Sequence, residues 1–174
     1  MRWNTGGFTS QLLLERLRRQ PVAGFLNRQQ AVEPLPGQVP PSALAVLMNS
    51  FTNSDGDQFP YFFRQYGLGK VVGSRTEGGV RGFQARWPLL DGATVTAPEN
   101  ALFRADRQWV IENVSTAPDL EVEEVPEGVA EEDAPLTAAV QELLRALPVS
   151  IGERLRVPPP LPAYPLGGQV PPAH

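Results

Sequence analysis

The stretch NSDGD, Asn53 to Asp57, holds the residues whose types and spacing most directly suggest chemistry. Ser54 would lie between the end of a buried strand and the start of a helix, which places its hydroxyl at the carboxyl edge of a sheet. Backbone N–H groups at such a helix start point towards an oxyanion formed there. The same spacing also fits an ordinary helix start, in which Ser54, Asp55 or Asp57 caps free N–H groups. Spacing alone favours the cap, although capping and catalysis do not exclude each other.

A serine nucleophile needs a base, and the sequence offers few candidates. The only histidine, His174, is the last residue of a proline-rich tail, which makes it a poor candidate. The only lysine, Lys70, could form a dyad with Ser54, because a desolvated lysine can act as a base. At the start of an expected strand, however, Lys70 fits an exposed charge better. The chain by itself therefore lacks an obvious base.

Three other segments have residue types that could take part in chemistry. NTGGF contains Gly6 and Gly7 before an expected helix; it fits a tight turn, or a backbone N–H donor close to a substrate. Glu112 ends an expected strand, where most glutamates are surface residues but one can orient a catalytic group. The run EGGVRG at 77–82 has neither the spacing nor the Lys-Ser/Thr ending of a phosphate-binding loop. No cofactor is expected.

The elements that would position these residues follow an α/β order. Leucines among Glu and Arg predict an amphipathic helix over 9–19, and five prolines predict an irregular connector over 21–42. The short apolar runs predict buried strands over 43–50 and 69–76. An aromatic helix is expected over 57–67, with Pro60 tolerated only in its first turn.

The second half of the sequence predicts a β-ribbon and one more helix. Alternation and turn signals over 83–111 indicate two or three antiparallel strands, and the acidic stretch EVEEVPEGVAEED indicates a solvated loop. Apolar residues on one face predict a helix over 135–148. The proline-rich tail over 149–174 is expected to lack regular structure.

Composition bounds the class of protein. At 174 residues, with 41% hydrophobic and 20% charged residues, the chain is about one globular domain. Its net charge of -4 gives no footprint for nucleic acid or for an anionic membrane, so neither partner is expected. The absence of cysteine excludes thiolate metal sites and cysteine nucleophiles, and fits a reducing compartment. No signal or membrane-spanning pattern is evident, so the expected location is the cytoplasm.

Several motifs in order carry a resemblance to a known family. RWNTGGFTSQLLLERLRR, then LMNSFTNSDGDQFPYFFRQYGLGKVVGSRTEGGVRG, then DGATVTAPENALFRADRQWVIENVSTAPDLEVE together resemble the C-terminal catalytic core of the tricorn proteases. These belong to the tail-specific, or C-terminal processing, serine peptidase superfamily. The resemblance covers residues 2 to about 125. It implies a layered α/β core of the ClpP/crotonase kind, partial here, over residues 1–148, followed by the tail.

The resemblance also implies roles for individual residues. The serine of the SDGD motif is the nucleophile, which is Ser54. The oxyanion hole is formed by the N–H of the next residue, Asp55, and by a glycine of the NTGG motif, either Gly7 or Gly6. Glu112 matches the acid that helps to order the catalytic polar network. Peptides would be the substrates, and the full-length protein would be a homo-oligomer.

The sequence departs from the family pattern in three ways. Glu77 stands where the family usually has Trp, and Ser115 and Thr116 replace a Gly-Val pair. The loop that carries a lysine in the Ser/Lys branch reads TEGGVRG here and has none, which favours the tricorn type. Tricorn-type enzymes take their histidine from an upstream helical domain, which this sequence does not contain. The resemblance therefore implies a proton acceptor from outside these residues, and an isolated chain that is inactive.

Overall fold

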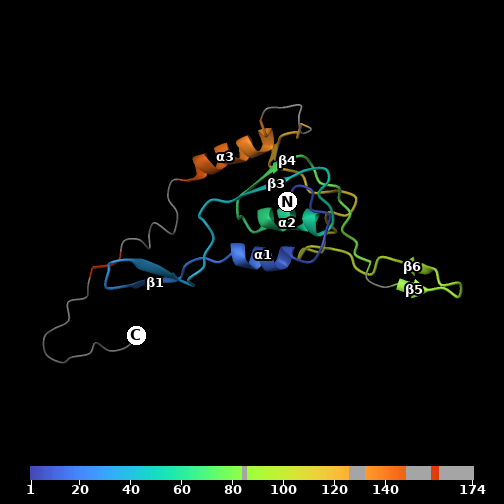
Figure 1. Cartoon of the computed structure of the whole chain (residues 1–174), viewed down its shortest axis with the longest axis horizontal. Helices are drawn as coiled ribbons and strands as arrows, with labels where there is room; N and C mark the ends of the chain where they lie inside the picture. Colours follow the sequence, from blue (N-terminus) through green and yellow to red (C-terminus); the bar gives the residue numbers. More distant parts are fainter. Residues whose placement is uncertain (84–85, 126–131, 148–157, 161–174) are drawn as a thin grey trace, which may run out of the picture.

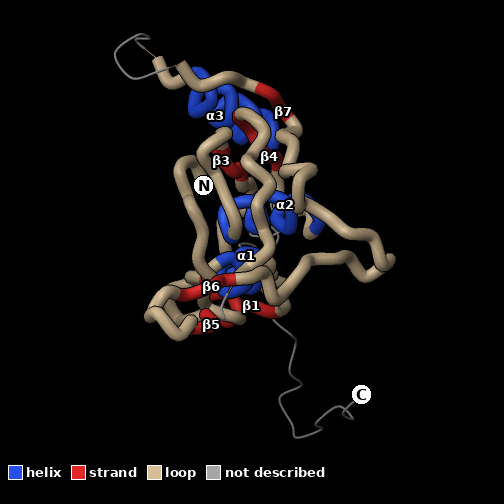
Figure 2. The backbone as a smooth tube through the Cα atoms, turned by 90° about the vertical axis from the view of Figure 1, so that its right-hand side faces the viewer, coloured by secondary structure: helices blue, strands red, loops and turns tan. Residues whose placement is uncertain are grey.

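A computed structural model describes residues 1–83, 86–125, 132–147 and 158–160. Its centre is a parallel sheet in the order β3, β4, β7, formed by Ala45–Met48, Lys70–Gly73 and Leu120–Glu121. Helix α3, Ala134–Ala146, covers one face of this sheet. Helix α2, Asp55–Gln65, lies on the other face with α1, Ser10–Leu17, beyond it (Figure 1). Figure 2 shows the same order of layers, as the α/β prediction requires.

The core forms where the short apolar strands meet the aromatic helix. Val46 and Met48 of β3 and Val71 of β4 are buried against Phe59 and Phe63 of α2. Phe59 and Phe63 are one turn apart, so their rings stack on the same face of the helix, with centroids 6.0 Å apart. The expected strands are present, each shorter than predicted. This packing fixes the start of α2 at the carboxyl end of β3.

Helix α2 differs from the prediction in its bounds and in the place of its proline. It begins at Asp55, two residues before the expected start at 57, and ends at Gln65. Pro60 therefore lies inside the helix and not in its first turn, where it removes the hydrogen bond that an N–H would donate to the Gly56 carbonyl. The fully buried proline ring contributes to packing against the core, which offsets part of that loss.

The connector predicted to be irregular over 21–42 contains a hairpin over 23–35, so the prediction was wrong there, whereas residues 36–42 have no helix or strand. Ala23–Leu26 (β1) pairs antiparallel with Val32–Leu35 (β2). Asn27 closes the turn, since its Oδ1 accepts the N–H groups of Gln29 and Ala31 at 3.0 and 2.9 Å. Pro34 is tolerated because a two-stranded ribbon is all edge, where a missing N–H need not break a ladder.

The predicted ribbon over 83–111 is present. Arg86–Pro88 (β5) pairs antiparallel with Thr94–Thr96 (β6), and Phe103 forms an isolated antiparallel bridge with Trp109. The β1–β2 and β5–β6 hairpins project from opposite ends of the molecule (Figure 1). The acidic stretch predicted to be a loop begins with β7, which pairs with Val72 and Gly73 of β4.

The helix predicted over 135–148 corresponds to α3, but only part of its apolar face is buried. Pro135 and Ala139 are buried, whereas Leu136, Val140, Leu144 and Leu147 are exposed. The tail prediction falls outside the described residues except for 158–160. Within the described part of the chain, every helix is too short or too polar to span a bilayer.

Candidate active site

Ser54 occupies a strained turn between β3 and α2. Its φ of 57° and ψ of -116° place a non-glycine residue in a left-handed region that costs free energy and is often found at functional sites. Ser54 stands at the N-cap position of α2, yet its side chain makes no capping hydrogen bond. The capping role that spacing alone favoured for Ser54 is therefore not what its hydroxyl does in the structure.

The NTGG segment lies directly against this turn. The Asn4 carbonyl accepts the N–H of Asn53 at 2.8 Å. A Cβ added to Gly6 would lie 3.1 Å from Ser54 Cβ and 3.4 Å from its Oγ, a tight contact at a φ of 131° that residues with side chains rarely adopt. A Cβ on Gly56 would lie 2.4 Å from the Asn4 carbonyl oxygen. Two motifs that are about fifty residues apart in the sequence therefore interlock through main chain and glycine.

Two backbone N–H groups near Ser54 in the chain or next to Gly6 make no hydrogen bond within the described residues. The Gly6 N–H donates to Asn4 Oδ1 at 3.1 Å and is thus engaged. Within the described residues, the N–H groups of Gly7 and Asp55 donate no hydrogen bond. Asp55 is the first residue of α2, where N–H groups lack an intrahelical acceptor and the helix dipole is positive.

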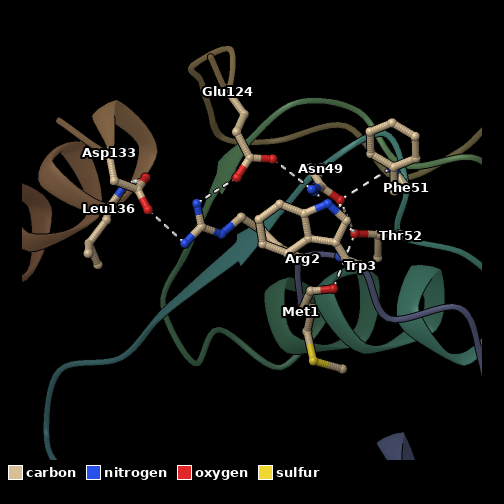
Figure 3. Close-up of polar contacts among 9 residues, drawn as sticks. All are labelled: Met1, Arg2, Trp3, Asn49, Phe51, Thr52, Glu124, Asp133 and Leu136. Atoms are coloured by element: carbon tan, nitrogen blue, oxygen red, sulfur yellow. Dashed lines mark hydrogen bonds and ion pairs between the residues drawn. The ribbon is translucent and has the colours of Figure 1, made fainter. Parts of the chain in front are cut away.

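A polar network anchors the start of the chain to the end of β3 (Figure 3). Asn49 Oδ1 accepts the Trp3 N–H at 3.2 Å, and Thr52 Oγ1 donates to the Met1 carbonyl at 3.2 Å. Glu124 Oε2 accepts from Asn49 Nδ2 at 2.7 Å, while its Oε1 pairs with Arg2 at 2.7 Å. Arg2 also pairs with Asp133, the N-cap residue of α3, at 2.8 Å. The network joins the residues before NTGG to the sheet and to α3.

Asp133 illustrates how this network sets charge. The hydrogen bond from Arg2, then the one from the Leu136 N–H, lower the pKa of Asp133 below its ordinary value. Both partners stabilise the ionised carboxylate. The contacts that hold Arg2 against Asp133 therefore also favour the ionised form of this carboxylate.

The loop over 76–82 forms another wall of the site and is held by two carboxylates. Asp57 Oδ1 accepts the Gly78 N–H at 2.9 Å. Glu112 Oε2 accepts the N–H groups of Val80 and Arg81, both at 2.9 Å. Asp57 is fully buried, and its Oδ2 has no hydrogen-bond partner among the described residues. Burial raises the pKa of Asp57, because it penalises the charged form, although the hydrogen bond from Gly78 opposes that rise.

The segment that carries Glu112 has a strained backbone. Ile111, Asn113 and Ser115 have φ values of 71°, 59° and 69°. A positive φ is a particular outlier for the β-branched, buried Ile111. Such strain persists only where surrounding contacts fix it, and here the Asn113 N–H donates to the Gly78 carbonyl at 2.9 Å.

Two departures from the family motifs meet in this wall. Ser115 Oγ donates to the Glu77 carbonyl at 3.0 Å. The Glu77 carboxylate accepts a hydrogen bond from Asn53 Nδ2, and the Glu77 N–H donates to the Thr52 carbonyl at 2.9 Å. Glu77 is exposed. It thus places an acidic group at the rim, held by the two residues that precede Ser54.

The structure brings together some of the predicted residues and separates others. Ser54, Asp55, Gly6 and Gly7 gather at one point, while Glu112 reaches that point only through the 76–82 loop. Lys70 pairs in register with Ala45 at the opposite end of the β3–β4 pair, so the structure does not bring it to Ser54. His174 lies outside the described residues.

The structure gives Asn4 and Asp57 contacts that their motifs do not predict. The NTGG motif predicts only a turn or a backbone donor, and Asp57 in NSDGD is predicted only as a possible helix cap. Their partners, Asn53 and Gly78, lie 49 and 21 positions away along the chain. The sole local signal was the pairing of two acids with glycine in SDGD.

Comparison with known proteins identifies the family. Residues 1–122 match the model of peptidase family S41. The tricorn protease of Thermoplasma acidophilum is 34% identical over 148 residues, which make up 84% of this chain and 14% of that protein. Tricorn protease homolog 1 of Streptomyces coelicolor is 36% identical over 163 residues, 93% of this chain and 15% of that protein. The chain therefore belongs to peptidase family S41.

Within that family the chain resembles the tricorn proteases. It superposes on the crystal structure of the tricorn protease with a TM-score of 0.75 at 34% identity, over 83% of this chain and 14% of that one. The recognition made from the ordered motifs is confirmed, as is the mixed α/β class. The chain spans only a small part of the length of these curated relatives.

Proposed function

We propose that this chain is the nucleophile-bearing core of a tricorn-type serine peptidase that hydrolyses peptide bonds in oligopeptides. Ser54 Oγ attacks the peptide carbonyl carbon, and the N–H groups of Asp55 and Gly7 stabilise the resulting oxyanion. A histidine from sequence upstream of these residues accepts the Ser54 proton and then passes it to the leaving amine. The longer protein that contains the core assembles as a homo-oligomer.

One observation carries the proposal. Ser54 has a positive φ at the N-terminus of α2 and lies against Gly6, and within the described residues the N–H groups of the adjacent Asp55 and of Gly7, next to Gly6, donate no hydrogen bond. A helix cap would need neither the strain nor the close approach of a second glycine motif. Both fit a nucleophile, because its oxygen must face the substrate carbonyl carbon while backbone donors lie about 3 Å from the carbonyl oxygen on which charge develops.

The choice between Gly6 and Gly7 rests on hydrogen bonding. The Gly6 N–H donates to Asn4 Oδ1, so its use would break an existing bond. The Gly7 N–H is unengaged within the described residues, and Gly7 has open space around its Cα. We therefore assign the second oxyanion donor to Gly7.

Glu112 acts in this proposal as a positioning residue. Its carboxylate accepts two consecutive N–H groups of the 76–82 loop. The residues on either side of Glu112, Ile111 and Asn113, have strained backbone conformations. By fixing that loop, Glu112 shapes the wall opposite the NTGG segment. This role does not require direct contact with Ser54.

Covalent labelling tests the proposal. The chain, expressed together with upstream sequence that carries the histidine-bearing region, is treated with a fluorophosphonate probe and analysed by peptide mass spectrometry. We expect the label on Ser54, none on that peptide after Ser54→Ala, and unchanged labelling after Ser50→Ala, which alters an exposed serine four positions earlier. A folded chain that takes no label would instead be a non-catalytic scaffold.

The isolated chain provides a second test, of the source of the base. Residues 1–174 alone should not turn over chromogenic peptides, because their only histidine ends the tail. Turnover by the isolated chain that disappears in Ser54→Ala would contradict an external histidine.

A further inference from the structure

The carboxylate of Asp55 lies at the N-termini of two helices. Asp55 is the first residue of α2 and is 4% exposed. Its Oδ2 accepts the N–H groups of Thr9 and Ser10, both at 3.1 Å, and the hydroxyl of Thr9 at 3.2 Å. In return, Ser10 Oγ donates to the Asp55 carbonyl at 2.8 Å. The first residues of α1 and α2 are thus joined by reciprocal hydrogen bonds.

Helix α1 depends on Asp55 for its cap. Thr9 occupies the N-cap position but makes no side-chain capping bond, and the first turn of α1 has no acidic residue. A helix leaves its first N–H groups without intrahelical acceptors, and a nearby negative charge stabilises that end. Asp55 supplies both the acceptor and the charge from a different helix, so it fixes where α1 begins relative to Ser54.

The segment between Asn4 and Thr9 is therefore held at both ends by the neighbours of Ser54. At its start, the Asn4 carbonyl accepts the N–H of Asn53, the residue before Ser54. At its end, Thr9 and Ser10 donate to Asp55, the residue after Ser54. Gly7 lies between these two anchors. The position of its N–H relative to Ser54 is set by the residues on either side of Ser54.

We propose that Asp55 organises the whole oxyanion hole: its main chain supplies one donor, and its carboxylate positions the other, the N–H of Gly7. This inference rests on the proposed function for Ser54 and Asp55. Donors stabilise a developing oxyanion only within a narrow range of distance, so a loosened Gly7 loses most of its effect. The Asp55 side chain is a positioning group and touches no substrate.

Two variants and one control separate positioning from general stability. Asp55→Ala removes every contact of the carboxylate, and Asp55→Asn keeps one oxygen acceptor without the charge. Asp119→Asn is the matched control: Asp119 Oδ2 accepts the Val71 N–H at 2.9 Å and Asp119 pairs with Arg64, at the other end of β4. Urea unfolding of each variant measures the general loss of stability.

The first measurement is amide hydrogen exchange of the 174-residue chain. Asp55→Ala should accelerate exchange at Thr9 and Ser10, the two amides that donate to the carboxylate, beyond the change seen at Phe63 in the core. Asp55→Asn should fall between Asp55→Ala and the wild type. Asp119→Asn should leave these two amides unchanged. If the two amides exchange in Asp55→Ala as they do in the wild type, the positioning role is overturned.

The second measurement is fluorophosphonate labelling with the histidine-bearing region present. Asp55→Ala should lower the rate of covalent inactivation by about 100-fold, the usual cost of one oxyanion donor. The non-covalent affinity for the probe should be little changed, and Asp55→Asn should recover part of the rate. A merely structural role would weaken the rate of covalent inactivation and the non-covalent affinity for the probe together.

The possible failures are distinguishable. Wild-type chain that takes no label overturns the proposed function, and with it any oxyanion hole. Wild-type chain that labels, together with Asp55→Ala and Asp55→Asn that label at the same rate, overturns only the positioning role.

Discussion

The two ends of the β3–β4 pair differ in the burial of their polar side chains. At the end near Ser54, polar side chains are buried and bonded to one another across long stretches of sequence. At the other end, a cavity of about 390 Å³ opens between α3 and the starts of β3 and β4. Its charged side chains, Arg64, Lys70, Asp119 and Glu142, are all at least partly exposed.

The contrast holds for every buried polar side chain in the described ranges. Each lies on the turn between β3 and α2, lies in the first turn of α2, or is linked to that turn by hydrogen bonds: Ser10, Asn49, Thr52, Asp55, Asp57, Thr76 and Thr116. Burial of polar groups costs free energy unless they are fully bonded, and apolar groups would fill the same space more simply. The difference indicates that the polar side chains near Ser54 are retained for function, because packing alone would favour apolar residues there.

The largest expected effect comes from crowding the Ser54 end. Gly6→Ala places a Cβ 3.1 Å from Ser54 Cβ at a φ of 131°, which alanine rarely adopts. We expect the rate of fluorophosphonate labelling to fall by about 100-fold, because a small displacement of a reacting group has effects of this size. Gly37→Ala, whose Cβ would meet only Pro34 O at 3.9 Å, is the control and should label normally. Equal labelling rates for Gly6→Ala and Gly37→Ala would show that the close approach of Gly6 to Ser54 does not affect the reactivity of Ser54.

The next effect comes from releasing the 76–82 loop. Glu112→Ala removes a carboxylate that accepts two N–H groups, and we expect a loss of about 2 kcal/mol in the free energy of unfolding. Exchange of the Val80 and Arg81 amides should accelerate, which two-dimensional NMR can measure. Glu112→Gln keeps one acceptor and should lose less. Unchanged protection of both amides in Glu112→Ala would show that the loop is held by other contacts.

A smaller effect concerns the pH dependence of stability at Asp57. Its pKa is raised on folding from an ordinary value of 3.8, so the folded chain holds this proton more tightly than the unfolded chain does. The contribution of Asp57 to stability is therefore greatest below 3.8 and declines as the pH rises through the folded pKa. Urea unfolding at several pH values should show that Asp57→Asn removes this decline.

The test of this prediction is whether the contribution of Asp57 to the free energy of unfolding falls or rises with pH. If the wild type minus Asp57→Asn difference in unfolding free energy rises with pH over the same window, the carboxylate is stabilised in its ionised form. The burial that distinguishes this end of the sheet would then be offset by contacts that the structure does not show for Asp57 Oδ2.

The smallest expected effect lies at the cavity end. Lys70→Met should leave labelling of Ser54 within about twofold of the wild type, because strand residues rise about 3.3 Å each and Lys70 is three residues from the carboxyl end of β4. The same labelling assay measures it, with Ser54→Ala as the reference for complete loss. Loss of labelling in Lys70→Met would revive a Ser54/Lys70 dyad.

The elements that could be predicted from the sequence are those specified by local patterns. The apolar runs around Val46 and Val71 and the aromatic spacing of Phe59 and Phe63 identify β3, β4 and α2 without any knowledge of the rest. The β1–β2 hairpin was missed because Pro34 argues against a strand except at an edge. Strand β7 was missed because Leu120 and Glu121 lie in an acidic stretch, and their partner strand is distant in sequence.

The site divides in the same way. Ser54 could be singled out because SDGD stands at a strand-to-helix junction, and the ordered motifs then identified the family. The contacts of Asp57 with Gly78 and of Glu112 with Val80 and Arg81 could not be predicted, since nothing local specifies them. The capping of α1 by the Asp55 side chain could not be predicted for the same reason, because α1 begins 45 residues before Asp55.

The network in Figure 3 has a consequence for the order of synthesis and folding. Arg2 pairs with Glu124, 122 positions later, and Trp3 bonds to Asn49, 46 positions later. Contacts of such high sequence separation close slowly and late. Residues up to Asp133 must leave the ribosome before Arg2 can pair with both of its acidic partners, Glu124 and Asp133. The strands and α2 can therefore form on the nascent chain, while the end of the sheet near Ser54 is completed only after nearly all of the core has been synthesised.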